Sequence, residues 1–242
     1  MYLFHRPLRK IVLIVNRCSI VKHGDTNFSV IINPDNGPGP AAWPKGEYIA
    51  GIKALNKYPN VKTLGYIDTA GGSRENTTVI KEIATYAGWS NVSAEMTLSG
   101  IYFDHTPYAD ESNAAAYLAN VSATVRHSNG FGSNAIVVHN PGRLPAVRLM
   151  ASKPDLIVIF EGAYDYMPRK KELSTRPIGS LQKREDVAML VHSVPRELGK
   201  TGLRKMIDDV RKDVEWLYIT DLTDKVYEGY GALLEAWLDV IW

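Results

Sequence analysis

The stretch GIYFD, residues 100–104, indicates the fold, because a buried strand there ends in a carboxylate, Asp104. A second apolar run, LIVIF at residues 156–160, is followed by Glu161 in the same way. Catalytic groups of (β/α)8 barrels gather at the C-terminal ends of the strands, and the gap between the two acids leaves room for about two β/α units of ~30 residues. We therefore predict a barrel with two carboxylates placed for acid/base or nucleophilic chemistry.

The rest of the chain continues this alternation of short apolar runs and longer amphipathic stretches, which is typical of βαβ units with a parallel sheet. From the second run onward each strand ends in a polar residue that could face one mouth of a barrel. The predicted strands are 10–15, 28–32, 61–67, 100–103, 134–138, 156–160, 187–191 and 216–219. The predicted helices are 42–57, 76–87, 110–128, 196–212 and 230–240, with only a brief helix after the fifth strand because of Pro141, Gly142 and Pro145.

The beginning of the chain fits this pattern least. Residues 16–27 lack a helical apolar period, although a parallel crossover normally needs a dozen or more connecting residues. The expected fold class is α/β, a (β/α)8 TIM-type barrel whose first β/α unit is divergent or incomplete. We expect a divergent N-terminal segment over 1–26 and a single barrel catalytic domain over 27–242.

Composition excludes several classes of protein. The chain has 242 residues, 45% of them hydrophobic, which is enough for one large domain. A formal net charge of +2 without a concentrated basic patch does not indicate a nucleic-acid partner. Cys18 is the only cysteine, which excludes an internal disulfide and a cysteine-based zinc site. No run approaches the ~20 apolar residues of a membrane span, and we expect a monomer.

Five motifs, in order, resemble spherulin 4-like proteins, the spherulation-specific family 4. They are IINPDNGPGP at 31–40, LGYIDT at 64–69, GIYFD at 100–104, HNPG at 139–142 and FEG at 160–162. The resemblance runs over roughly residues 28–240. It implies a (β/α)8 barrel and a secreted or cell-surface glycoside hydrolase of fungal type, in a family that includes endo-α-1,4-galactosaminidases acting on galactosaminogalactan.

The resemblance also assigns the catalytic residues. Active members end the fourth strand in an Asp-Glu pair and a later strand in a Glu; Asp104 matches the first acid and Glu161 the last. His105 stands where the family has its second acid. Two carboxylates still suffice for glycoside hydrolysis, and which one is the acid stays open. The alternative is a catalytically impaired carbohydrate-binding protein on the same barrel.

Other residues at strand ends are candidates for binding a polysaccharide. The predicted substrate-binding residues are Asn33, Asp68, His105, Asn140, Tyr164 and His192. Tyr66, two positions before Asp68, faces the same side of its strand, with core packing as the competing interpretation. A polar ring of His139, Asn140 and His192 makes a metal imaginable, but no tight histidine spacing supports one. We expect no metal and no cofactor; the loop at 33–40 lacks the ending of a phosphate-binding loop, which disfavours nucleotide binding.

Secretion has weak support in the sequence itself. Four sites carry the Asn-x-Ser/Thr pattern of glycosylation acceptors, namely Asn27, Asn76, Asn91 and Asn120. The chain begins with basic residues, but the apolar stretch at 11–15 is shorter than a signal peptide requires. A secreted or cell-surface location therefore follows from the resemblance and not from a visible signal peptide.

Overall fold

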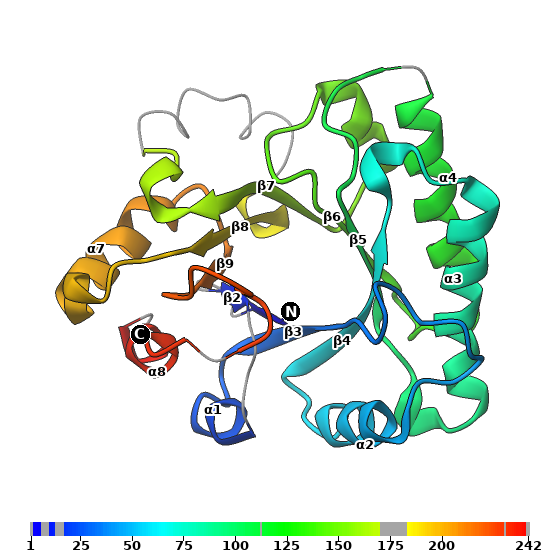
Figure 1. The fold of residues 1–242 in the computed structure, drawn as a ribbon, viewed down its shortest axis with the longest axis horizontal. Helices are drawn as coiled ribbons and strands as arrows, with labels where there is room; N and C mark the ends of the chain where they lie inside the picture. The colour runs from blue at the N-terminus through cyan, green and yellow to red at the C-terminus, as the bar shows by residue number, and fades with distance from the viewer. Residues whose placement is uncertain are drawn as a thin grey trace. The chain divides into compact units, whose positions relative to one another are not determined.

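The computed structural model describes residues 2–5, 10–12, 17–111, 113–169, 183–229 and 231–240. Strands and helices alternate along them (Figure 1). The chain divides into a central unit, Ile31–Ile157, and a terminal unit, which combines Met1–Val30 with Val158–Trp242.

Parallel strands form the sheet of the central unit. They are β4 (Val61–Asp68), β5 (Gly100–Asp104) and β6 (Ile136–His139). The register aligns Asp68 with Asp104, and Phe103 with His139. The first residues of β7 (Leu156–Ala163) continue the parallel pairing, with His139 opposite Ile157. This arrangement brings the C-terminal ends of consecutive strands to one edge, as the alternation in the sequence predicts.

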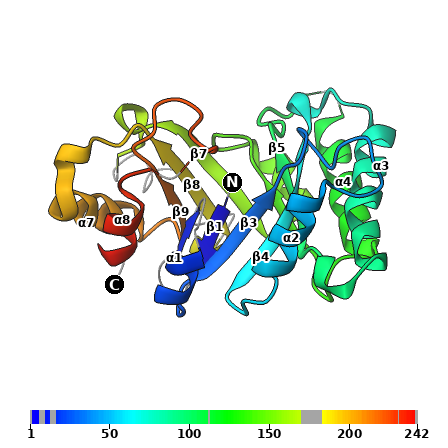
Figure 2. The same cartoon turned by 60° about the horizontal axis from the view of Figure 1, so that its bottom comes forward.

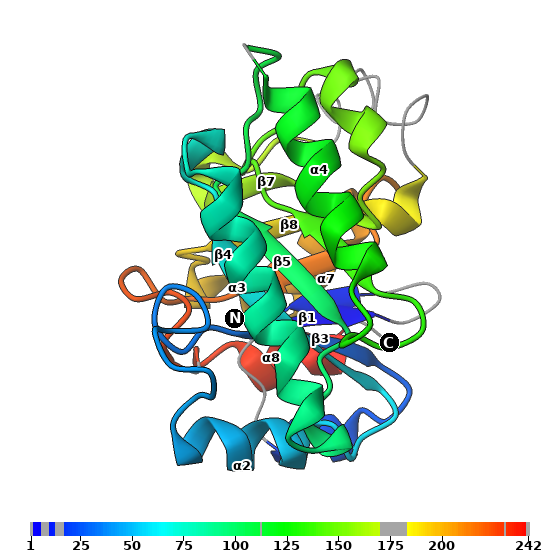
Figure 3. The same cartoon turned by 90° about the vertical axis from the view of Figure 1, so that its right-hand side faces the viewer.

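Helices cover this sheet because they present apolar residues at helical spacing. They are α2 (Gly46–Leu55), α3 (Asn76–Gly88) and α4 (Ala114–His127), with short 3-10 turns η1 (Ala70–Gly72), η2 (Trp89–Asn91), η3 (Ala94–Met96) and η4 (Val147–Ser152). α4 buries Leu118, Val121 and Val125, an i, i+3, i+7 stripe. α2 lies beside β4 (Figure 2), and α3 and α4 lie side by side with their first turns at the same end (Figure 3).

Tyr86 of α3 fixes the position of β4. Its hydroxyl donates to the backbone carbonyl oxygens of Tyr66 (2.9 Å) and Ile32 (3.0 Å). Gly65 makes room for the ring, since a Cβ there would lie 2.8 Å from Tyr86. A close approach of this kind requires glycine, and it holds the strand that carries Asp68.

The terminal unit combines parallel and antiparallel strands. They are β1 (Tyr2–His5), β2 (Lys10–Val12), β3 (Asn27–Ile32), which ends in the central unit, β8 (Val187–His192), β9 (Trp216–Ile219) and the end of β7. β2, β9 and β8 pair in parallel, whereas β1 pairs antiparallel with both β2 and β3. β1 is a strand that the sequence pattern did not reveal, and α1 (Arg17–Lys22) forms within residues 16–27, where the sequence shows no helical apolar period. The divergence of the first β/α unit stays a prediction.

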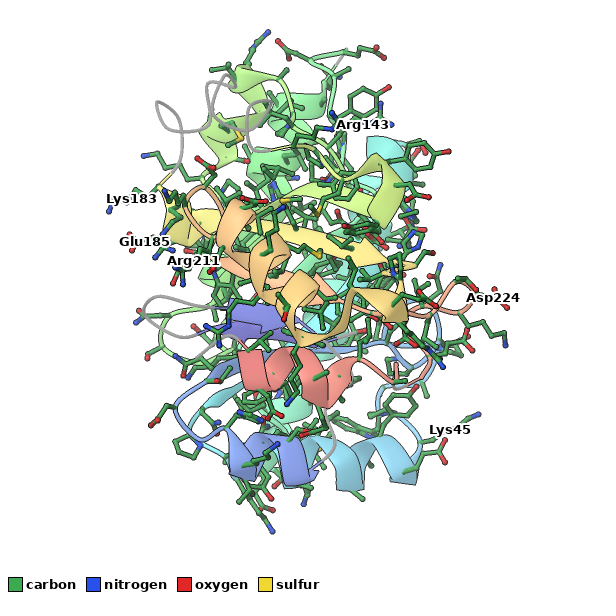
Figure 4. The ribbon with its side chains drawn as sticks, turned by 90° about the vertical axis from the view of Figure 1, so that its left-hand side faces the viewer. Lys45, Arg143, Lys183, Glu185, Arg211 and Asp224 are labelled. Carbon is green, nitrogen blue, oxygen red and sulfur yellow. The ribbon has the colours of Figure 1, made fainter. Side chains whose placement is uncertain are left out.

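The helices of the terminal unit are short except for one. They are α1 (Arg17–Lys22), α7 (Gly199–Val210) and α8 (Leu234–Val240), with 3-10 turns η5 (Tyr164–Tyr166), η6 (Arg184–Asp186) and η7 (Arg196–Leu198). α7 and α8 lie side by side (Figure 4). Just before β8, Lys183 and Glu185 form an ion pair at 3.3 Å, and Arg211, which follows α7, lies near them (Figure 4). The Arg184 guanidinium donates to the Arg211 carbonyl at 2.7 Å.

Each predicted apolar run contains an observed strand, although residues 13–15 of the first run lie outside the described residues. The brief helix expected after the fifth strand is the 3-10 turn η4. β7 extends to Ala163, so Glu161 lies within a strand and not just after one. The fold is α/β with parallel strands in both units; closure into a complete barrel and the division at residue 26 stay predictions. No helix in the described part of the chain is long and apolar enough to cross a membrane.

Candidate functional site

Three polar side chains meet at the C-terminal edge of the central sheet. Asp68 and Asp104 end neighbouring strands in register, and Asn140 follows β6 directly. Backbone hydrogen bonds continue the pairing past the strands, because the Thr69 amide donates to the Asp104 carbonyl at 2.9 Å and the Asn140 amide to the Phe103 carbonyl at 2.8 Å. The sheet itself therefore positions the three groups.

Asp104 is held at both carboxylate oxygens. Oδ1 accepts a hydrogen bond from Asn140 Nδ2 at 2.6 Å, and Oδ2 accepts one from the Tyr66 hydroxyl at 2.8 Å. The side chain is only 14% exposed. Hydrogen bonds to an ionised group are shorter and stronger than neutral ones. The carboxylate thus has a defined orientation and limited access to solvent.

His105 adopts a backbone conformation that is uncommon for a residue with a side chain. Its φ is +46°, in the left-handed region, and its side chain is 68% exposed. Nδ1 lies 3.1 Å from Asp68 Oδ1 and 4.0 Å from Asp104 Oδ2. The Thr69 hydroxyl donates to the carbonyls of Asp104 and His105 (3.0 and 2.8 Å), which fixes the turn. Strained residues of this kind cluster at functional sites.

Asp68 orients the loop that follows β4. Its Oδ1 accepts from the backbone amide of Ala70 at 2.7 Å, and its carbonyl accepts from Arg74 Nη1 at 2.6 Å. Arg74 in turn pairs with Glu82 of α3 (Nη1 to Oε2, 3.0 Å). The sequence did not reveal Arg74 or Glu82, because neither belongs to a recognisable motif.

Asn33 is exposed and stabilises the proline and glycine loop at 33–40. Its Oδ1 accepts from the Gly37 amide at 3.0 Å, and its carbonyl accepts from the Tyr48 hydroxyl at 3.1 Å. The side chain therefore has a structural role in this turn, and its role in binding substrate stays a prediction.

Glu161 belongs to the terminal unit. Its Oε1 accepts a hydrogen bond from the hydroxyl of Tyr227, which lies in the loop between β9 and α8. The Tyr227 ring packs against Tyr218, with centroids 5.5 Å apart, and Tyr218 donates to the Val226 carbonyl. Burial raises the pKa of Tyr218, so its hydroxyl stays protonated. No sequence motif pointed to Tyr227.

Two further candidates lie in the same unit. Tyr164 begins the 3-10 turn after β7 and is half-buried. His192 ends β8, is half-buried, and lies 2.8 Å from the Ser193 hydroxyl through Nδ1. Burial lowers the pKa of His192. Asp221 is held by Arg196 (Nε to Oδ2, 2.6 Å) and by the Leu233 amide, contacts that stabilise the fold.

His139 does not join the polar ring that the sequence suggested. It is buried, and its Nε2 lies 3.0 Å from the Ser122 hydroxyl of α4. Its ring also meets the Phe103 ring edge-on at 5.9 Å between centroids. Burial lowers the pKa of His139 to about 3. Because side chains alternate along a strand, Asn140 faces Asp104 while His139 faces the helix.

One cluster of potential metal ligands occurs among the described residues. It contains His23, Glu235 and Asp239, whose ligand atoms lie within 4.8 Å of one another. The Lys22 ammonium already bonds to Glu235 (3.0 Å) and to Asp239 (2.8 Å). The carboxylates thus have a cation partner within the protein, and we assign no metal to this cluster.

Comparisons with known proteins agree with the motifs. The model of the spherulation-specific family 4 matches residues 17–241. The crystal structure of Aspergillus clavatus Sph3 in complex with GalNAc is similar, with a TM-score of 0.86 and 33% identity, covering 93% of this chain and 89% of that one. A glycerophosphodiester phosphodiesterase from Parabacteroides distasonis has a TM-score of only 0.37 at 13% identity and carries no argument. No protein with a curated description matches the chain.

Proposed function

This chain belongs to the spherulation-specific family 4, and on that premise we propose that it is a glycoside hydrolase of the endo-α-1,4-galactosaminidase type. Its substrate is an α-linked, galactosamine-containing polysaccharide of a cell wall or matrix, cleaved by a (β/α)8 barrel domain over 27–242. The observation that carries the proposal is the immobilised strand-end carboxylate of Asp104, which accepts from both Tyr66 and Asn140.

The class of substrate rests on the similarity to Sph3, whose crystal structure contains GalNAc. That similarity extends over 93% of this chain and is accompanied by 33% identity. An N-acetylated or free galactosamine unit is therefore the first sugar to test. The candidate binding residues Asn33, Asp68, His105, Asn140, Tyr164 and His192 remain part of this proposal, with Asn140 acting through Asp104.

The two carboxylates have different roles in the proposed mechanism. The Asn140 Nδ2 group can only donate and the Tyr66 hydroxyl donates to the other oxygen, so both oxygens of Asp104 act as acceptors. An oriented acceptor suits the anionic role, as nucleophile or as general base toward water. Glu161 then protonates the oxygen of the leaving sugar, as glycoside hydrolysis requires of the second carboxyl. Tyr227 orients Glu161 through its hydroxyl.

We also propose a secreted or cell-surface location, since a polysaccharide of the wall or matrix is met outside the cell. Asn91 and Asn120, two of the four glycosylation acceptors, are exposed. Mass spectrometry of tryptic peptides from protein secreted by a fungal host tests the proposal. Glycan on these asparagines supports it, and retention of the whole protein inside the cells contradicts it.

His105 favours one second candidate, a carbohydrate-binding protein without hydrolytic activity. By family resemblance this position carries the second acid, and here an exposed histidine occupies it. A binding protein retains the polymer but releases no products. The same experiment distinguishes the two functions.

The test is product release, measured by mass spectrometry, from purified galactosaminogalactan and from a panel of α- and β-glucans. The intact protein is compared with Glu161→Gln. Oligosaccharides from galactosaminogalactan with the intact protein alone would support a hydrolase of this specificity. Retention of the polymer without products would favour the binding protein, and neither binding nor cleavage would contradict both.

A further inference from the structure

The loop that joins β4 to α3 has an unusual backbone. Ala70, Gly71 and Gly72 have φ angles of +47°, +68° and +84°, so three successive residues lie in the left-handed region. A left-handed backbone is unfavourable for a residue with a Cβ, such as Ala70. Backbone of this kind persists only where the surrounding contacts hold it. Because the loop follows Asp68 directly, whatever holds the loop also places Asp68.

Arg74 makes two contacts that hold this loop to the end of β4. Its Nη1 donates to the Asp68 carbonyl at 2.6 Å, and its backbone amide donates to the Thr69 carbonyl at 3.4 Å. The side chain is only 25% exposed. The planar guanidinium offers several donors at fixed angles, which the single ammonium of a lysine does not. Arg74 therefore closes the loop back onto the strand that carries Asp68.

Glu82 of α3 fixes the guanidinium of Arg74. Its Oε2 accepts from Nη1 at 3.0 Å and its Oε1 accepts from Nη2, so the ion pair is bidentate. A bidentate pair holds both groups in one orientation, and the Glu82 side chain is only 21% exposed. Tyr86, one turn further along α3, bonds to the carbonyls of Tyr66 and Ile32. One face of α3 thus anchors both β4 and the loop that follows it.

The loop in turn contacts two residues of the candidate site. Asp68 Oδ1 accepts from the Ala70 amide at 2.7 Å and lies 3.1 Å from His105 Nδ1. The Gly71 amide donates to the His105 carbonyl at 2.7 Å. The side chains that donate to the Asp104 carboxylate belong to β4 and to the segment after β6, and not to this loop. A displaced loop should therefore disturb Asp68 and His105 and leave the Asp104 carboxylate in place.

We propose that Arg74, oriented by Glu82, is a positioning residue for the proposed hydrolysis. It keeps the loop after β4 in the conformation that places Asp68 and His105 for binding the sugar. Its contribution is to substrate binding and not to the chemical step, because the donors to Asp104 lie outside the loop. The proposal rests on the proposed function, in which Asp68 and His105 are substrate-binding residues.

Arg74→Lys tests this role, since it keeps the positive charge but loses the planar fork. Arg126→Lys is the matched control, because Arg126 of α4 also donates to a backbone carbonyl, that of Lys153, and to a carboxylate, that of Asp155. Initial rates of reducing-end release are measured over a range of galactosaminogalactan concentrations. KM should rise about tenfold in Arg74→Lys, which corresponds to about 1.4 kcal/mol of lost binding, with kcat changed less than about twofold. Arg126→Lys should match the intact protein in both.

The titration of the His105 imidazole, followed by NMR, is a readout that a purely structural role would not move. Asp68 and Asp104 are the carboxylates that lie within 4.0 Å of Nδ1, so the midpoint of the titration reports the position of Asp68. The signal is assigned from its absence in His105→Gly. Asp68→Asn gives the midpoint without that carboxylate, and Arg74→Lys should shift the midpoint in the same direction. Arg126→Lys should leave it unchanged.

Glu82→Gln is a milder change that tests the pair even where Arg74→Lys does not fold. It should raise KM about threefold, and the double variant should be no worse than Arg74→Lys alone, because both changes act on one contact. An unchanged KM in these variants, or an equal rise in Arg126→Lys, contradicts the positioning role while the proposed function stands. An intact protein that does not cleave the polymer contradicts the proposed function, and the His105 midpoint still decides whether Arg74 positions Asp68.

Discussion

The two candidate carboxylates are held in different ways, although both directly follow apolar runs of the sequence. Asp104 accepts from side chains of the strands on either side, Tyr66 of β4 and Asn140 after β6. Glu161 accepts from Tyr227, which belongs to a loop 66 positions further along the chain. One carboxylate is therefore oriented by the register of a parallel sheet, and the other by a loop.

This difference shows why the surroundings of only one of the two carboxylates could be predicted. In a parallel sheet, neighbours at strand ends follow from the strand order, so Asp68, Asp104 and Asn140 could be brought together from sequence alone. The face of Tyr66 also follows from alternation along β4. Nothing in the spacing of the chain indicates which loop residue reaches Glu161, and Tyr227 appears only in the structure.

Removing either carboxylate should have the largest effect. Asp104→Asn and Glu161→Gln keep the shape of the side chain but remove the anion or the transferable proton, so each should lower the cleavage rate about 10³-fold or more. The melting temperature should change little in both. Reducing-end release from galactosaminogalactan is the measurement, and an active Asp104→Asn protein would contradict the role of this strand end.

Removing the hydrogen-bond donors to each carboxylate should have the second largest effect on activity. A hydrogen bond to a charged group contributes about 1.5–3 kcal/mol, so Asn140→Ala and Tyr66→Phe should each reduce kcat/KM about 10- to 100-fold. The Tyr227 bond goes to the protonated acid, where a neutral hydrogen bond contributes about 0.5–1.5 kcal/mol, so Tyr227→Phe should reduce kcat/KM about 2- to 10-fold. The pH profile of kcat/KM distinguishes these variants. Asn140→Ala and Tyr66→Phe should shift the limb that reports the ionisation of Asp104, whereas Tyr227→Phe should shift the limb that reports Glu161. Identical profiles for all three would show that the two carboxylates do not have distinct roles. Ser90→Ala, which loses a bond to the Ala87 carbonyl at the end of α3, serves as a control.

His139 faces the core, whereas its neighbour Asn140 faces Asp104, and the burial of His139 should make the stability of the protein depend on pH. Its pKa is about 3 in the folded protein and near 6.5 when unfolded, so the unfolded chain binds the proton more readily. The contribution of His139 to the free energy of unfolding is therefore fully present above pH 6.5 and is lost as the pH falls toward 3. At pH 5 the loss is roughly 2 kcal/mol. His23 and His192, whose pKa values burial also lowers, act in the same direction.

The check is urea unfolding at pH 7 and pH 5. His139→Gln retains a nitrogen that can reach Ser122 but does not titrate, so the pH dependence of its unfolding free energy should be smaller by about 2 kcal/mol. Thr124→Ala, a change on α4 that removes no titrating group, should leave the dependence unaltered. Equal slopes for intact protein and His139→Gln would show that this histidine is protonated in the folded state.

His105 should give the smallest effect, because its side chain is mostly exposed. Glycine relieves the left-handed backbone, so His105→Gly should stabilise the protein by about 1 kcal/mol and raise the melting temperature by ~2–4 °C. His105→Glu restores the acid that the family resemblance implies and should raise the cleavage rate. A rate that falls in His105→Glu would assign the histidine a role of its own beside Asp68.

The limits of prediction lie mostly outside regular structure. Most strands and helices followed from apolar periodicity, but α1 forms where no helical period was present and β1 pairs antiparallel where no alternation indicated it. His139 shared a motif with Asn140 and yet faces α4, because adjacent residues of a strand point to opposite sides. The pair of Arg74 and Glu82 joins a loop to a helix, and no local pattern in the sequence brings the two residues together.

The most direct test of the division of roles uses α-galactosaminyl fluoride, whose leaving group needs no protonation. If Glu161 is the acid and Asp104 the anion, Glu161→Gln should release fluoride in its first turnover at nearly the rate of the intact protein, while Asp104→Asn should remain inactive. Fluoride release, followed with an ion-selective electrode, measures both. Hydrolysis by Asp104→Asn with an inactive Glu161→Gln would reverse the assignment, and no hydrolysis by the intact protein would contradict the account.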